Sequence, residues 1–192
     1  MKKILLIVAI AGTVLAGCSK SGAGSKMRVI LASELISLDE AKNLLGNNST
    51  VNNGTDRSGY HDRIMYRLPG SYYFGLSLWQ EALYNKSDWR SYLQEMENVW
   101  KTHPRKTKST INGGTAYHIP FNPAATGAEL AGKSFQQHMM YIFYGDYYII
   151  LDIQNTTPDL TDNPTETAKK ISILNNAANV ALTNLKRILD NN

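Results

Sequence analysis

The chain has 192 residues, with 20 basic and 16 acidic side chains, a formal net charge of +4 and a single cysteine. One cysteine excludes a disulfide within the chain, and the length suits a single domain stabilised by its own core. Without Lys2 and Lys3, which belong to the leader described next, 18 basic residues balance 16 acidic ones. A charge this close to neutral argues against nucleic acid as a partner.

The amino terminus has the features of an export signal. Lys2 and Lys3 precede an uninterrupted run of apolar and small residues from 4 to 16. This run is too short to cross a bilayer as a helix, which takes about 20 residues. A basic start followed by a short apolar stretch predicts a secretory signal peptide.

The end of this leader, Leu15-Ala16-Gly17-Cys18, resembles the lipobox of bacterial lipoproteins. The resemblance implies cleavage before Cys18, lipidation of its thiol by acyl chains such as palmitate, and anchoring to a bacterial membrane outside the cytoplasm. In a Gram-negative envelope, Ser19 is compatible with the outer membrane. The alternative is an ordinary signal peptide with an incidental cysteine, which would leave a reactive thiol in an exported protein.

The residues after the cysteine, SKSGAGSK, are small and polar and predict a flexible tether. We therefore expect a signal peptide over 1–17, the lipidated cysteine and tether over 18–27, and a single globular α+β domain over 28–192. Two or more acyl chains anchor a protein stably, whereas one chain binds reversibly.

The first predicted element of the domain is a helix that starts after Ser37 and stops at Gly46. Ser37 suits the N-cap, and Glu40, three residues later, completes the capping-box pattern. Glycine adopts the backbone conformation that ends a helix without steric cost.

A hairpin and a second helix are predicted next. Segments 60–68 and 72–79 alternate or are rich in aromatic residues, and Pro-Gly-Ser separates them, so we expect two strands joined by a turn. From Ser87, as N-cap, to Trp100 the apolar residues recur at helical spacing and predict a helix that faces the core. This stripe consists of Trp89, Tyr92, Leu93, Met96, Val99 and Trp100.

A third strand and a second hairpin follow. The segment 111–121, INGGTAYHIPF, predicts a turn and then a strand. Aromatic and β-branched runs flank Gly145-Asp146, a dipeptide typical of two-residue hairpin turns.

The last predicted element is a long helix up to residue 189. Asn163 suits its N-cap, Pro164 its first position, and Glu166 completes a capping box. Since strands mostly follow strands through short turns, we predict an α+β fold. Its largely antiparallel sheet of about five to six strands is packed by an N-terminal, a middle and a long C-terminal helix.

The octapeptide GAELAGKS matches the phosphate-binding P-loop pattern at Gly127, Gly132, Lys133 and Ser134. A P-loop needs a buried strand before it and a helix that begins at the Lys-Ser pair. The approach contains two prolines, which exclude a central strand, and the aromatic run after it fits a helical face but predicts a strand in its second half. We reject the match and expect no nucleotide or other cofactor.

A Walker B strand is imitated by IILD, which ends in Asp152. Alternation places Ile149 and Leu151 on one face of the strand and Asp152 on the other. The Asp152 carboxylate is therefore expected on the face of the strand opposite these apolar side chains.

Five basic or titratable residues gather after the middle helix: Lys101, His103, Arg105, Lys106 and Lys108. Cations beyond a helix C-terminus complement its dipole, so a solvated loop is the simplest interpretation. The alternative hypothesis is a loop that binds anionic envelope polymers or lipid headgroups.

The four histidines form no metal-binding spacing, and we expect no metal site. His118 and His138 lie on strands that we expect to share one sheet, so they can be close together. No serine-hydrolase motif occurs, and the sequence identifies no catalytic residues.

The capped first helix and the GG-x-AY turn at Gly113 to Tyr117 resemble small extracytoplasmic lipoproteins with a PsbP-like α/β sandwich. That resemblance implies a fold and an envelope location. The leading hypothesis is a membrane-tethered, non-enzymatic binding or assembly-support module whose partner is an envelope protein or an anionic polymer. An envelope hydrolase that acts on cell-wall or lipid material, and a surface-exposed adhesin or exclusion factor, are the alternatives.

Overall fold

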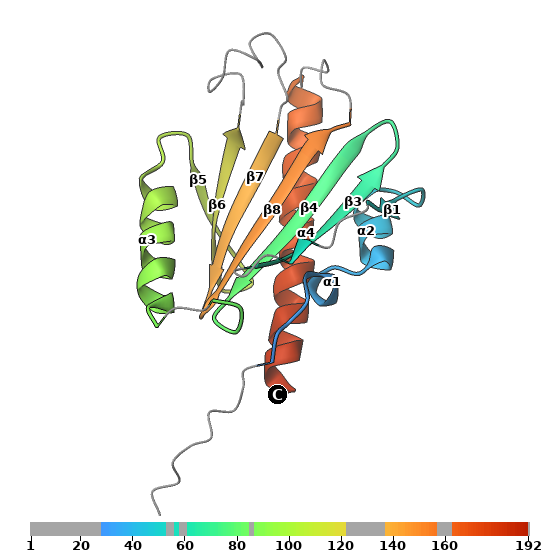
Figure 1. The fold of residues 1–192 in the computed structure, drawn as a ribbon. Helices are drawn as coiled ribbons and strands as arrows, with labels where there is room; N and C mark the ends of the chain where they lie inside the picture. Colours follow the sequence, from blue (N-terminus) through green and yellow to red (C-terminus); the bar gives the residue numbers. More distant parts are fainter. Residues whose placement is uncertain are drawn as a thin grey trace, which may run out of the picture.

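The computed structural model describes residues 28–52, 56–57, 61–84, 87–121, 137–156 and 163–191. Within these residues, eight antiparallel strands form one sheet in the order β1-β3-β4-β8-β7-β6-β5, with β2 also paired to β3 (Figure 1). The longer strands are β3 (His61–Leu68), β4 (Tyr72–Gln80), β5 (Thr107–Ile111), β6 (Gly114–Phe121), β7 (Gln137–Tyr144) and β8 (Tyr147–Asn155). The short ones are β1 (Thr50–Val51) and β2 (Asp56–Arg57).

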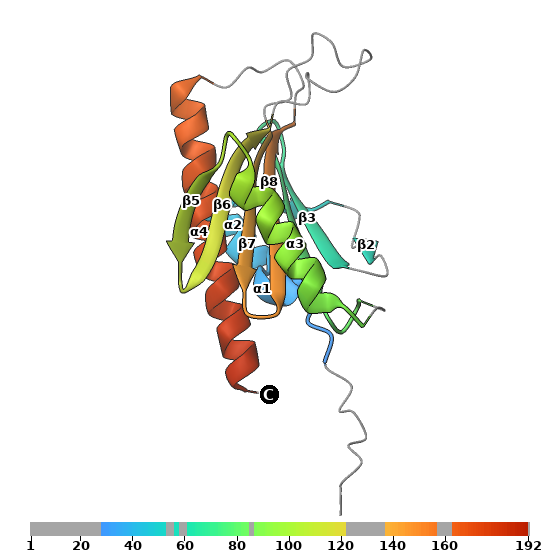
Figure 2. The ribbon, with the colours of Figure 1, turned by 90° about the vertical axis from the view of Figure 1, so that its left-hand side faces the viewer.

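Helices cover both faces of this sheet (Figure 2). The long α4 (Pro164–Asp190) lies on one face with the short α1 (Ala32–Leu35) and α2 (Leu38–Leu45), and we call this the α4 face. The middle helix α3 (Trp89–Thr102) lies on the other, the α3 face. The predicted α+β fold with a largely antiparallel sheet and three helical regions is thereby confirmed, and the two-residue strands are additions to it.

Alternation along the strands divides the core into two clusters. On β8, Ile149, Leu151 and Ile153 join the α4-face cluster, whereas Tyr148 joins the α3-face cluster, as predicted. Ile64 and Tyr66 of β3 likewise face α4. Both predicted hairpins form, and Ile142 pairs with Ile149 across the second.

The strand β5 was not predicted. Its sequence, TKSTI, is polar except at the last residue, so it lacks an apolar alternation, and it forms because β6 pairs with it along its whole length. Asn112 and Gly113 connect the two strands with positive φ values of 45° and 80°. Positive φ at both central residues is the conformation of a type I′ hairpin turn, which explains the Asn-Gly sequence.

Two of the three predicted helix starts are confirmed. The Ser37 side chain accepts a hydrogen bond from the Glu40 amide, and Asn163 does the same for Glu166. Gly46 ends α2 with a φ of 136°. The cap predicted at Ser87 is wrong, because Asp88 occupies the N-cap of α3 and makes no side-chain cap bond.

Two details of the helices also differ from expectation. Glu166 was predicted to complete a capping box at the start of α4. Its carboxylate accepts a hydrogen bond from the Tyr72 hydroxyl of β4, so it links α4 to the sheet. Val99 was expected in the core, but 45% of its surface is exposed. The rest of the α3 stripe packs as predicted, with Trp89 and Leu93 buried.

Several sequence predictions fall outside the described residues. These are the signal peptide, Cys18, the tether, and the P-loop match at Gly127, Gly132, Lys133 and Ser134. The residues from Gln137 onward are the strand β7, which confirms the strand predicted for the second half of the segment after that match. In the part of the chain that is described, no helix has the length and apolar character needed to cross a membrane.

Candidate functional site

The basic residues predicted as an anion-binding loop gather where α3 passes into β5. Lys101 lies in the last turn of α3, His103 is its C-cap, and Arg105 and Lys106 lie in the turn that follows. Lys108 lies on β5, so the prediction of a loop at this position is wrong. We call residues 101–108 the basic segment.

The cations of the basic segment are exposed to solvent. Lys101, Arg105, Lys106 and Lys108 are all exposed, and in the described ranges no carboxylate forms an ion pair with any of them. Four cations that are close in sequence and lack such a partner leave a local positive potential, which attracts anions.

Local contacts give the basic segment a defined shape. The Arg105 amide donates to His103 Nδ1 at 3.2 Å, and Lys106 Nζ reaches the His103 carbonyl at 3.5 Å. Lys108 Nζ lies 5.9 Å from the centre of the Tyr117 ring, a cation–π geometry. The turn is therefore organised around His103, which contacts both the Arg105 backbone and the Lys106 side chain.

The basic segment and the start of the described chain lie at opposite ends of the domain. In Figure 1 the connection from α3 to β5 is near the top, whereas the segment that leads into α1 is at the bottom, and Figure 2 agrees. At the bottom, the Gln80 side chain at the end of β4 exchanges two hydrogen bonds with the backbone of Ile30, at 2.8 and 2.7 Å. These bonds tie the entry of the chain to the sheet.

His118 and His138 form a buried pair on the α4 face, which confirms the predicted proximity. His118 Nε2 and His138 Nδ1 are 3.2 Å apart, and the two rings stack with an angle of 5° between their planes. Burial, and secondarily the neighbouring His138, lower the pKa of His118 to about 4. His118 is therefore neutral near pH 7. The described residues contain no group of three or more His, Cys, Asp and Glu side chains suited to a metal ion.

A third polar group lies on the α3 face and was missed by the sequence reasoning. Arg63 Nη2 is 3.3 Å from Asp152 Oδ2, and Gln137 Nε2 lies 3.5 Å from Oδ1 of the same carboxylate. β4 runs between the strands of Arg63 and Asp152, and the small Gly75 and Ser77 leave space for the pair to reach across it.

Gly75 is essential to this geometry. A Cβ added there would overlap the Asp152 carboxylate, with Cγ only 2.9 Å away. Burial raises the pKa of Asp152, while Arg63 and Gln137 oppose the shift. Arg63 Nε is buried without a hydrogen-bond partner within the described ranges. A glycine inside an aromatic strand was the only sequence signal for this site.

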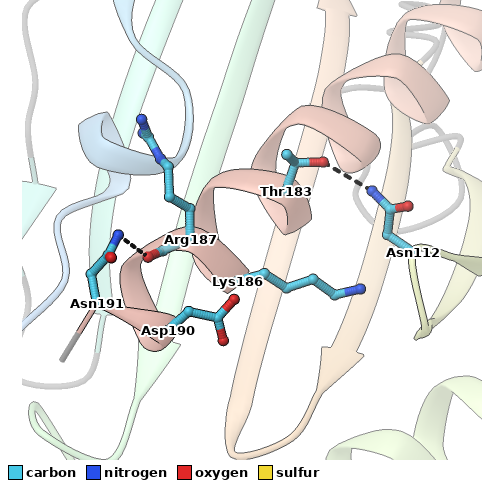
Figure 3. A pocket seen from close by; sticks show the side chains of 6 residues that line it. All are labelled: Asn112, Thr183, Lys186, Arg187, Asp190 and Asn191. Carbon is cyan, nitrogen blue, oxygen red and sulfur yellow. Dashed lines mark hydrogen bonds between the residues drawn. The ribbon is translucent and has the colours of Figure 1, made fainter.

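A shallow pocket lies between the C-terminus of α4 and the turn of the β5–β6 hairpin (Figure 3). Asn112 Nδ2 donates to Asn179 Oδ1 at 2.7 Å and to Thr183 Oγ1 at 3.0 Å, so the turn is fastened to α4. Asn191 also lines the pocket, and Lys186, Arg187 and Asp190 give the lining charges of both signs. The hydrogen bonds explain Asn112 as a structural residue.

Comparisons with known proteins give no guide to function, because no protein-family model, curated protein or solved structure matches the chain. The chemistry must be inferred from the groups above. The His118–His138 pair and the Arg63–Asp152 pair face opposite sides of the sheet, so they do not converge on one substrate. The basic segment, by contrast, is exposed to solvent.

Proposed function

We propose that the protein is a lipid-anchored bacterial envelope lipoprotein that acts as a non-enzymatic binding or assembly-support module. The observation that carries the proposal is the position of the only cysteine, Cys18, at the end of a leader with the lipobox pattern Leu15-Ala16-Gly17. Acylation consumes the thiol and holds the domain outside the cytoplasm, at the outer membrane where the envelope is Gram-negative.

The geometry of the domain supports an anchored binder. The tether of residues 18–27 spans at most about 35 Å when extended. It would join the domain at the end where the chain leads into α1, whereas the basic segment lies at the other end. The domain is therefore expected to present its cations away from the membrane that holds it, toward an anionic polymer or an envelope protein.

The relation to PsbP-like lipoproteins belongs to the same proposal. An antiparallel sheet between helices on both faces supports it. The relation adds an envelope location and no catalytic residues.

Metabolic labelling with a clickable palmitate analogue tests the anchor. We expect the wild-type protein and a Ser19→Ala control to be labelled and to fractionate with membranes. Cys18→Ala should lose the label and the membrane fraction. A soluble cytosolic protein that retains its leader and bears no acyl chain would contradict the proposal.

In-cell photo-crosslinking tests the binding role. A photoreactive residue in place of the exposed Thr107, in the basic segment, should capture an envelope protein or polymer, whereas one in place of the exposed Asn175 of α4 should not. Equal capture from both positions would argue against a specific surface. Release of cell-wall or lipid fragments by the purified protein would favour the hydrolase, and surface labelling of intact cells would favour an adhesin or exclusion factor.

A further inference from the structure

In the part of the chain that the structure describes, β5 forms an open edge of the sheet. β5 is the last strand in the sheet order, and within the described residues β6 is its only paired neighbour. Figure 2 shows β5 at the margin of the sheet, with α3 on one side of it and α4 on the other. An exposed edge strand presents backbone N–H and C=O groups that can pair with a further strand.

The hairpin register identifies which groups point outward. A two-residue turn is closed by a hydrogen-bonded pair, here Ile111 with Gly114, and hydrogen-bonded pairs then alternate with non-bonded ones. Ser109 and Thr107 are in the bonded pairs. Thr110 and Lys108 are in the non-bonded pairs, so their backbone groups face the open edge.

The two sides of this edge differ in charge. The side chains of Lys108 and Thr110 share the α3 face with Tyr117 and lie next to the basic segment. On the α4 face, the uncharged Asn179 and Thr183 bond to the hairpin turn, and Lys186, Arg187 and Asp190 beside it carry charges of both signs. Ile111 packs against the core from the same face.

We propose that β5 is a docking edge for an extended segment of another protein that is acidic at alternate positions. Successive residues of an added strand point to opposite faces, so every second side chain would meet Lys108 and the neighbouring cations. The residues between them would meet Ile111 and the α4 side of the edge, where charges of both signs lie beside the hairpin turn. This inference rests on the proposed binding role and names the chemistry of the partner.

A second copy of the chain is a poorer occupant of this edge. Two β5 strands paired edge to edge would bring two basic segments together, and like charges across a strand pair destabilise it. Lysine on an open edge thus disfavours self-association while it favours an acidic strand.

The test uses the purified full-length protein in detergent micelles and a fluorescent peptide that spans the five residues of β5 with Glu and Thr alternating. Binding is measured by anisotropy at an ionic strength of about 50 mM, where surface charges are weakly screened. We expect saturable binding, with slower amide hydrogen exchange at Lys108 and Thr110. Lys108→Glu should weaken binding by about tenfold or more, because it converts attraction into repulsion.

A matched pair of variants separates backbone pairing from charge. Thr110→Pro removes an outward amide that the hairpin does not use, and should weaken binding by about tenfold. Thr110→Ala keeps the amide and should bind within about twofold of wild type. If Thr110→Pro proves unstable in thermal unfolding, a peptide N-methylated at alternate residues provides the same test and should not bind.

Four outcomes would overturn the inference. One is no binding of the alternating peptide. Another is a combined result, in which a peptide with its glutamates in one block binds as well as the alternating peptide and Thr110→Pro binds fully. That result would indicate an anionic polymer that is bound through its charge alone. A third is sedimentation that shows a dimer abolished by Thr110→Pro. The last is undiminished binding by Lys108→Glu. Since none of these measurements depends on Cys18, failure here leaves the palmitate labelling test unaffected, and failure of labelling leaves the edge geometry unaffected.

Discussion

The two faces of the sheet are packed by different kinds of side chain. On the α4 face, a helix of 27 residues packs aliphatic side chains against the strands, and Leu174, Ala178 and Leu182 are fully buried. On the α3 face, a helix of 14 residues covers only part of the sheet, with mainly aromatic rings. The difference indicates that the α4 face supplies most of the stability. Buried polar groups occur on both faces, with His118 and His138 on the α4 face and Asp152 on the α3 face.

The largest expected effect is a cavity on the α4 face. Leu182→Ala should lower the free energy of unfolding by about 3–4 kcal/mol, because the side chain is fully buried within a packed core. On the α3 face, Leu93→Ala should cost about 2 kcal/mol, since Leu93 lies at the margin with 8% of its surface exposed. Urea unfolding measures both, and Val99→Ala, exposed on α3, is the control with little expected change. Equal losses of unfolding free energy in Leu182→Ala and Leu93→Ala would contradict the proposed difference between the two faces.

The next effect is the pH dependence of the free energy of unfolding, which arises from His118 on the α4 face. The pKa of His118 is about 4 in the folded state, below its ordinary value of 6.5. Between these values the unfolded chain binds a proton that the folded protein does not, so the free energy of unfolding falls as the pH is lowered from about 6.5 to about 4. The loss attributable to His118 reaches about 3 kcal/mol at the lower limit.

Urea unfolding between about pH 7 and about pH 4.5 measures this slope. His118→Asn should flatten it, because the variant has no group to titrate there. Asp152 on the α3 face has the opposite sign. Its pKa is raised by burial, so the folded state gains relative stability as the pH falls from the raised value toward 3.8, and Asp152→Asn should remove that gain. An unchanged slope in His118→Asn would contradict the assignment.

A third experiment tests the charged pair on the α3 face. Gly75→Ala should lower the free energy of unfolding by about 2 kcal/mol, because the new Cβ displaces the Asp152 carboxylate from Arg63. In an Asp152→Ala background the carboxylate that would clash is absent. Gly75→Ala should then lower the free energy of unfolding by about 1 kcal/mol less, or by a still smaller amount. Strict additivity of the two substitutions would show that the carboxylate does not occupy the space above Gly75.

The smallest effect separates two serines that looked alike in the sequence. Ser37→Ala should cost about 1 kcal/mol, because the hydroxyl caps α2 on the α4 face. Ser87→Ala, at the start of α3, should change thermal stability little, since Asp88 holds the N-cap position there. Similar losses of stability in Ser37→Ala and Ser87→Ala would support the original prediction that Ser87 is the N-cap of α3.

Local patterns predicted the elements whose residues carry their own periodicity. Alternation identified β3 and β8, and capping residues located the starts of α2 and α4. β5 escaped because an edge strand with polar residues needs no apolar alternation. Lys170 shows the same limit in a helix, since a lysine is expected in solvent and this one is fully buried on α4.

The candidate sites were only partly visible in the sequence. The basic residues and the proximity of His118 and His138 were predicted, because the first are adjacent in the chain and the second follow from a shared sheet. The bridge between Arg63 and Asp152 joins residues 89 positions apart and depends on the glycine between them. Neither spacing nor composition carries that information.

By itself, the sequence determined the lone cysteine, the starts of α2 and α4 and the alternating strands, because these depend on residues near one another in the chain. Tertiary structure alone decided the strand order, the position of β5 at the end of that order and the burial of a carboxylate on the α3 face. Strand pairing and burial are set by the packing of distant segments, so residue types in sequence order do not contain them.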